Sequence, residues 1–182
     1  MSSKARTPEQ AIRSRRIRLA DRRAAGSLLR KAILLILALY VIFGILFGIT
    51  PMKGGDMQPK LSAGDLLLYY RLQEEYGRND VVLMKREGSS YVGRIIGMPG
   101  DTIEIAEDET VIINGKSIIE TEIFYPTGPF PQATQYPLTL KEDEFFLMGD
   151  HRETARDSRY FGAVKKAELK GKVITAVKRT DL

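Results

Sequence analysis

The chain has 182 residues, a formal excess of five positive charges and no cysteine. This length allows a short membrane anchor and one domain of ordinary size, and it leaves little room for a second globular domain. Without cysteine the chain can form neither disulfides nor zinc–thiolate sites. We therefore expect a core held by packing alone, with no metal and no other cofactor.

Positive charge is concentrated before a long apolar segment. Residues 1–31 hold ten basic side chains and two acidic ones, which predicts a basic cytoplasmic arm. Anionic membrane lipid accounts for such an arm, so we expect membrane lipid and not nucleic acid as its partner. The rest of the chain is net negative.

The apolar segment is predicted to be a retained transmembrane signal anchor over residues 32–50. The stretch Ala32–Ile49 has eighteen residues without a charge, and at about 1.5 Å per residue it nearly spans a hydrocarbon layer of roughly 30 Å. A cleaved signal peptide is the alternative, but its apolar region is shorter and ends in small residues that are missing here. Basic flanks stay inside, so we expect a single-pass cell-membrane protein with residues 51–182 outside the cell.

Residues 51–182 carry the signals of an antiparallel, barrel-like β domain. Asn114-Gly115 is a strong hairpin signal between Val111–Ile113 and Ser117–Ile119. Lys165–Leu169 resembles a short helix, and Phe124–Pro137, with four prolines, is typical of an irregular surface segment. The predicted strands are Asp65–Arg71, Asp80–Lys85, Ser90–Ile96, Thr102–Ile105, Val111–Ile113, Glu144–Leu147 and Lys172–Lys178.

Three sequence blocks follow the anchor in a fixed order. The first is Asp56-Met57-Gln58-Pro59 with Gly64-Asp65 downstream, and the second runs from Gly93-Arg94 to Gly100-Asp101. The third extends from Gly149-Asp150-His151-Arg152 to Asp157-Ser158-Arg159 and Gly162. Together the blocks resemble the type I signal peptidase (S26) family, whose members cut secretory signal peptides with a serine nucleophile and a lysine base.

The resemblance implies that three chemical positions have been replaced. Asp56 stands where the family has its serine, Gly93 where it has its lysine, and Ala155 where a serine orients the lysine. The serine–lysine mechanism needs a hydroxyl beside a neutral amine, and the matching positions supply neither. Ser62 cannot substitute without breaking the Met57-x-Pro59 register. We therefore predict no catalytic residues and a protein that is not an enzyme.

The same resemblance implies roles for the remaining site residues. An extended segment is expected to lie in the former substrate cleft, bound by Asp56, Met57, Pro59, Gly93 and Met98. Asp157, Ser158 and Arg159 are expected to be structural, with Asp157 and Arg159 as a charge pair. His151, the only histidine, is expected to be a hydrogen-bonded structural residue.

With these replacements the chain most resembles non-catalytic, signal-peptidase-like members found in pilus loci of Gram-positive streptococci. That resemblance implies an accessory or chaperone role in sortase-dependent pilus assembly, with a pilin subunit and a pilus-specific sortase as partners. Two alternatives stay open. One is an active membrane-bound endopeptidase with an atypical Asp56-based site, although aspartyl peptidases use two carboxylates. The other is a regulator that competes with active signal peptidases for precursors.

Overall fold

The computed structural model describes residues 8–118, 120, 123, 125, 127–128 and 134–179. The chain divides between Ile45 and Leu46 into two compact units, and each is described by itself.

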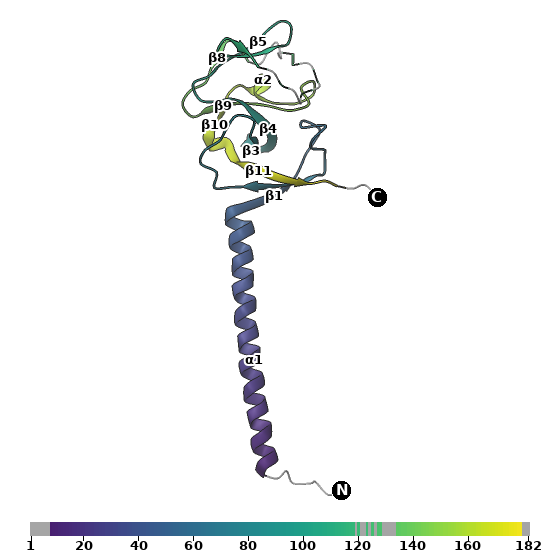
Figure 1. Cartoon of the computed structure of the whole chain (residues 1–182), viewed down its shortest axis with the longest axis vertical. Helices are drawn as coiled ribbons and strands as arrows, with labels where there is room; N and C mark the ends of the chain where they lie inside the picture. The colour runs from purple at the N-terminus through teal and green to yellow at the C-terminus, as the bar shows by residue number, and fades with distance from the viewer. Residues whose placement is uncertain are drawn as a thin grey trace. The chain divides into compact units, whose positions relative to one another are not determined.

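The N-terminal unit is a single long helix (Figure 1). Helix α1 spans Pro8–Tyr40 and continues as the π-helical segment η1, Val41–Leu46. Proline suits the first position of a helix, because a backbone N–H at that position would have no acceptor within the helix. The window Ala24–Leu46 has a mean hydropathy of 2.3 and no residue buried by protein. It is long and apolar enough to cross a membrane, which suggests single-pass anchoring.

The helix ends earlier than the apolar run from which it was predicted. Strand β1, Phe47–Pro51, takes up the last residues of the expected anchor and pairs with Leu66–Tyr70. A Cβ at Gly48 would collide with the Tyr69 ring, so this strand needs a glycine there. An apolar run alone does not distinguish the end of a helix from a strand that follows at once.

The second unit consists of two antiparallel sheets (Figure 1). The larger has the strand order β1-β2-β11-β3-β4-β9-β10, and the smaller has the order β7-β6-β5-β8. Every pairing between neighbouring strands is antiparallel. The further strands are β2 (Leu66–Tyr70), β3 (Val81–Arg86), β4 (Ser89–Gly97), β5 (Thr102–Ile105), β6 (Val111–Ile113), β7 (Lys116–Ser117), β8 (Leu138–Thr139), β9 (Glu144–Met148), β10 (Val164–Lys165) and β11 (Leu169–Val177).

The two sheets share a core. Phe146 and Met148 of β9 pack with Ile103 of β5 and with the buried side chains of β6. Gly97, at the end of β4, lies close to side chains of both sheets. A Cβ there would come within 2.9 Å of side-chain atoms of Ile103, Leu140 and Phe146. Any side chain at residue 97 would therefore force the sheets apart.

The predicted mostly β fold behind one apolar helix is confirmed. The expected helix at Lys165–Leu169 is a 3-10 turn, Lys166–Glu168, and Leu169 already belongs to β11. A short helix that was not predicted, α2, spans Ser158–Phe161 and is capped by Asp157. Ile119 of the predicted hairpin and residues 124, 126 and 129–133 of the irregular segment lie outside the described residues.

Candidate functional site

Asp56 lies in a turn-rich loop that joins β1 to β2. Met57 anchors the loop, because its side chain is fully buried in a cluster with Met52 and Leu67. Its far end is held by Asp65, whose carboxylate accepts the backbone N–H groups of Ser62 at 2.9 Å and Arg179 at 3.0 Å. These hydrogen bonds hold the pKa of Asp65 below its ordinary value. Asp56 is therefore presented by a rigid loop.

The three replaced positions meet at the segment Leu147–Gly149. The carbonyl oxygen of Asp56 accepts the N–H of His151 at 3.0 Å. A Cβ built on Gly149 would collide with the Cβ of Ala155 and with this same carbonyl oxygen. A Cβ built on Gly93 would lie 3.3 Å from the Cβ of Leu147 and 3.5 Å from the carbonyl oxygen of Met148. The fold thus gathers Asp56, Gly93 and Ala155 around one stretch of backbone.

The Asp56 carboxyl is a titratable group of this site with a shifted pKa. Its pKa is raised above 3.8, first by partial burial and second by the negative charge of Asp157, while His151 acts in the opposite direction. The group therefore holds its proton at a higher pH than an exposed aspartate does. A carboxyl with a raised pKa at a site of this kind is suited to exchange protons with a bound molecule.

His151 belongs to the same site. Its Nδ1 lies 3.0 Å from Thr154 Oγ1, and its ring lies against Tyr125 with centroids 4.1 Å apart. The expectation of a hydrogen-bonded residue thus agrees with its contacts. Sequence reasoning missed Tyr125, which falls in the segment expected to be irregular, and no local pattern pointed to it.

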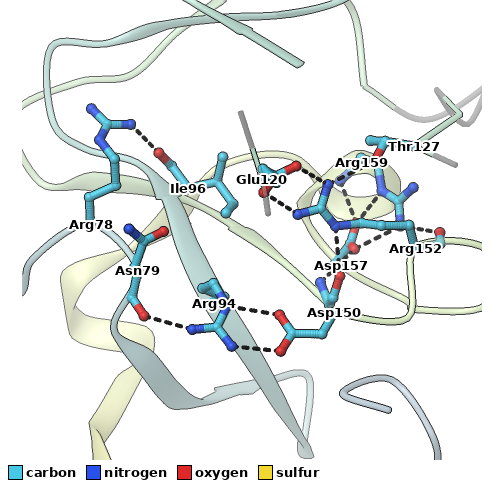
Figure 2. A network of polar contacts seen from close by, with 11 residues as sticks. Arg78, Asn79, Arg94, Ile96, Glu120, Thr127, Asp150, Arg152, Asp157 and Arg159 are labelled. Carbon is cyan, nitrogen blue, oxygen red and sulfur yellow. Dashed lines mark hydrogen bonds and ion pairs between the residues drawn. The ribbon is translucent and has the colours of Figure 1, made fainter. Parts of the chain in front are cut away.

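Buried charge pairs fix the loop that carries His151 (Figure 2). Arg94 donates two hydrogen bonds to Asp150, at 2.8 and 2.6 Å, and one to the Asn79 carbonyl. Arg152 pairs with Glu120 and donates to Thr127 and to the Gly149 carbonyl. Asp150 and Arg152, the neighbours of His151 in the sequence, are therefore both held by ion pairs.

The segment expected to be structural is joined to these pairs, because Arg159 donates to the Arg152 carbonyl at 2.6 Å. Asp157 receives two side-chain hydrogen bonds from Arg159, each 2.9 Å, and one from the Gly149 N–H at 2.9 Å. The Ser158 hydroxyl accepts the N–H of Leu147 at 2.9 Å. These bonds hold both ends of the segment Leu147–Gly149.

The other expected binding residues lie in different surroundings. Pro59 is exposed, whereas Met57 is buried and borders a mostly apolar hollow of about 190 Å3 with Lys60, Leu61, Val81, Arg94, Asp150 and residues 173–176. Met98 packs against a separate core cluster around Phe145 and Leu147. Of the five expected binding residues, Asp56 and Gly93 lie close to the backbone of Leu147–Gly149, and Met98 packs on the cluster that contains the Leu147 side chain. In the described part of the chain, no three His, Asp or Glu side chains form a group that could hold a metal ion.

The close contacts at Gly149 give a first prediction. Gly149→Ala is expected to lower the free energy of unfolding by about 1–3 kcal/mol, because the new methyl group displaces Ala155 or the Asp56 loop. Gly93→Ala is the matched control and is expected to cost less, because its Cβ would lie 3.3 Å from the Leu147 Cβ and would need a shift of only a few tenths of an ångström. Thermal unfolding of the two full-length variants in detergent micelles measures the difference. If Gly149→Ala and Gly93→Ala unfold at the same temperature, the Asp56 loop moves aside for the new methyl group at no measurable cost, and the prediction is wrong.

Comparison with known proteins places this site in context. Residues 26–177 match the family model described as signal peptidase, peptidase S26. Signal peptidase I of Bacillus licheniformis is 31% identical over 159 residues, covering 78% of this chain and 82% of the relative. Signal peptidase IB of Staphylococcus aureus is 31% identical over 163 residues, covering 76% and 85%. The crystal structure of a signal peptidase I from Enterococcus faecalis V583 is 31% identical and covers 56% of this chain and 98% of its own, with a TM-score of 0.44.

These relatives overturn one prediction. The expectation that the chain is not an enzyme is wrong, because similar proteins that align with most of its length are named signal peptidases and point to a peptidase. The prediction rested on three replaced positions, Asp56, Gly93 and Ala155, and it considered the serine–lysine mechanism first. The structure has a partly buried, titratable carboxyl at Asp56.

Proposed function

Because the chain belongs to the signal peptidase family, peptidase S26, we propose that it is a membrane-anchored endopeptidase of secreted polypeptides. In this proposal an extended segment of the substrate binds beside Asp56, and the Asp56 carboxyl is the acid–base group. The observation that carries the proposal is the meeting of Asp56, Gly93 and Ala155 at Leu147–Gly149 on an intact family framework.

The chemistry open to a single carboxyl is the activation of water. The Asp56 carboxylate would take a proton from water as the oxygen adds to the carbonyl carbon of the substrate. The proton would then pass to the amide nitrogen as the C–N bond breaks, which regenerates the carboxylate. Asp157 is not available as a second carboxylate, because Arg159 and the Gly149 N–H already occupy its oxygens.

We further propose that the basic arm stays in the cytoplasm and the β domain faces outward. The ten basic side chains before residue 32 support this orientation. The chain has no cysteine, so a single introduced cysteine can report on which side of the membrane its residue lies. We expect Lys85→Cys, on the exposed end of β3, to react with a membrane-impermeant maleimide in intact cells. Asp21→Cys should react only after permeabilisation, and the reverse pattern would contradict the orientation.

A second candidate concerns the identity of the bound segment. Asp56 and Gly93 at the serine and lysine positions resemble the family members of streptococcal pilus loci, which favours a pilin subunit as the bound protein. The protein would then act as an accessory in sortase-dependent pilus assembly, at the outer face of the membrane. Backbone pairing and side-chain pockets hold such a segment, and neither depends on a serine.

One experiment tests both candidates. A photo-crosslinking amino acid at Lys53, which is exposed and close to Asp56 in sequence, avoids disturbing the buried Met57. Adducts are identified in intact cells, and cleavage of a precursor is measured with the purified full-length chain. Signal-peptide adducts with cleavage support the endopeptidase, and mature pilin adducts support the accessory role. Precursor that is neither crosslinked nor cut would overturn the first candidate.

A further inference from the structure

A carboxylate that no sequence pattern singled out is joined to the site through a buried arginine. We propose that Glu120, which follows β7 of the smaller sheet, is a positioning residue for Asp56 and acts through Arg152 and Gly149. This inference deepens the proposed function and rests on it, because the group that Glu120 positions is the proposed acid–base group.

The guanidinium of Arg152 is fully buried and links Glu120 to Gly149 (Figure 2). Nη1 of Arg152 donates to Glu120 at 2.6 Å and to Thr127 at 2.7 Å, and Nη2 pairs with the second oxygen of Glu120. The third nitrogen, Nε, donates to the Gly149 carbonyl at 2.9 Å. A guanidinium is a rigid plane, so a carboxylate that binds both terminal nitrogens also sets the direction of Nε.

Glu120 supplies the negative charge that the buried Arg152 requires. The carboxylates of Asp150 and Asp157 are each paired with another arginine. Within the described part of the chain, Glu120 is the carboxylate that pairs with Arg152. A buried cation that loses its partner is strongly destabilised. Without the charge of Glu120 we therefore expect Arg152 to move and its Nε to leave the Gly149 carbonyl.

The position of Gly149 in turn fixes the backbone of Asp56. The Gly149 N–H donates to Asp157 at 2.9 Å, so the residue is held through its N–H as well as through its carbonyl. A Cβ built on Gly149 would collide with the Asp56 carbonyl oxygen, which shows that the two backbones are in direct contact. The N–H of His151 donates to the same oxygen at 3.0 Å. A shift of Gly149 therefore displaces the loop that presents Asp56.

The first measurement is precursor cleavage by the full-length protein in detergent micelles. Glu120→Gln keeps the shape of the side chain and removes its charge. We expect kcat to fall by about 10- to 100-fold with little change in KM, because a reacting group is displaced while the surfaces that bind the substrate stay in place. Glu109→Gln is the matched control and should keep the wild-type kcat, since Glu109 is exposed and lines the same open hollow as Glu120.

The second measurement is amide hydrogen exchange, which needs no substrate. The His151 N–H reports the contact with Asp56, and the Ile95 N–H, which donates to the Asp80 carbonyl at 2.9 Å, reports opening of the large sheet. In Glu120→Gln we expect exchange at His151 to become at least about tenfold faster, with a smaller change at Ile95. Equal acceleration at both amides would make Glu120 a residue of general stability and would overturn the inference.

A conservative variant keeps the test decisive. Glu120→Asp retains the charge on a shorter side chain, so we expect values between those of the wild type and Glu120→Gln in both measurements. It carries the test alone if Glu120→Gln does not fold. Wild-type kcat and wild-type exchange at His151 in the Glu120 variants would contradict the positioning role. Faster exchange at His151, with no cleavage even by the wild type, would instead overturn the proposed function and leave the link from Glu120 to the Asp56 loop standing.

Discussion

Replacing Asp157 by alanine is expected to lower the free energy of unfolding by about 3–5 kcal/mol, because it leaves a buried guanidinium without its counter-charge. The side chains of Asp157 and Arg159 are 5% and 1% exposed. Asp157 also accepts the Gly149 N–H, so its loss leaves this buried N–H without its hydrogen-bond acceptor. Thermal unfolding of the full-length variant in micelles, followed by near-ultraviolet circular dichroism of the tyrosines, should show a fall in Tm of roughly 10–20 °C.

A surface pair provides the control for this variant. Lys141 and Glu144 are 3.9 Å apart, and the Lys141 side chain is 80% exposed. Lys141→Ala is expected to change stability by less than about 1 kcal/mol, because exposed ion pairs contribute little. If Lys141→Ala and Asp157→Ala unfolded at the same temperature, the buried pair would not be the support that its geometry indicates.

Replacing Asp56 by asparagine is expected to reduce precursor cleavage by at least about 100-fold, because an amide cannot accept a proton from water. The substitution keeps the size of the side chain and the backbone hydrogen bond to His151. Cleavage of a purified signal-peptide precursor by the full-length protein measures the loss. Asp143→Asn, an exposed aspartate in the turn before β9, is the matched control and should leave the rate unchanged.

The pH dependence of cleavage gives a second test of Asp56. A base acts in its ionised form, so activity should be present above the pKa of Asp56 and should fall as the pH drops through it. Because that pKa is raised, the loss should begin at a higher pH than for an ordinary aspartate. Cleavage that persists in Asp56→Asn with the same pH profile would assign the chemistry to another residue.

Much of the fold could be predicted because its signals are local. The strands around Val111–Ile113 and Thr102–Ile105 are short β-branched runs bounded by turn residues, and the structure has them at the expected bounds. Asn114-Gly115 fixed the pairing of Ile113 with Lys116 in the same way. Strand β1 was missed because its apolar residues continue those of the helix without a break.

The site was harder to predict, because its geometry depends on residues distant in sequence. The blocks group Asp56, Gly93 and Ala155 in one predicted site, but they do not predict that the three approach Leu147–Gly149. Met57, which was expected to bind a ligand, is buried in the core and borders the mostly apolar hollow. The contact between Tyr125 and His151 joins two loops, and such a contact leaves no periodic pattern in the sequence.

The position of β11 in the large sheet has a consequence for how the domain is made. This last strand pairs with β2 on one side and with β3 on the other, so it joins the earliest strands of the domain to the rest of the sheet. A ribosome releases those early strands long before their common neighbour, and until then each has an edge with unpaired backbone groups. The sheet of the nascent domain can therefore close only after β11 has left the ribosome.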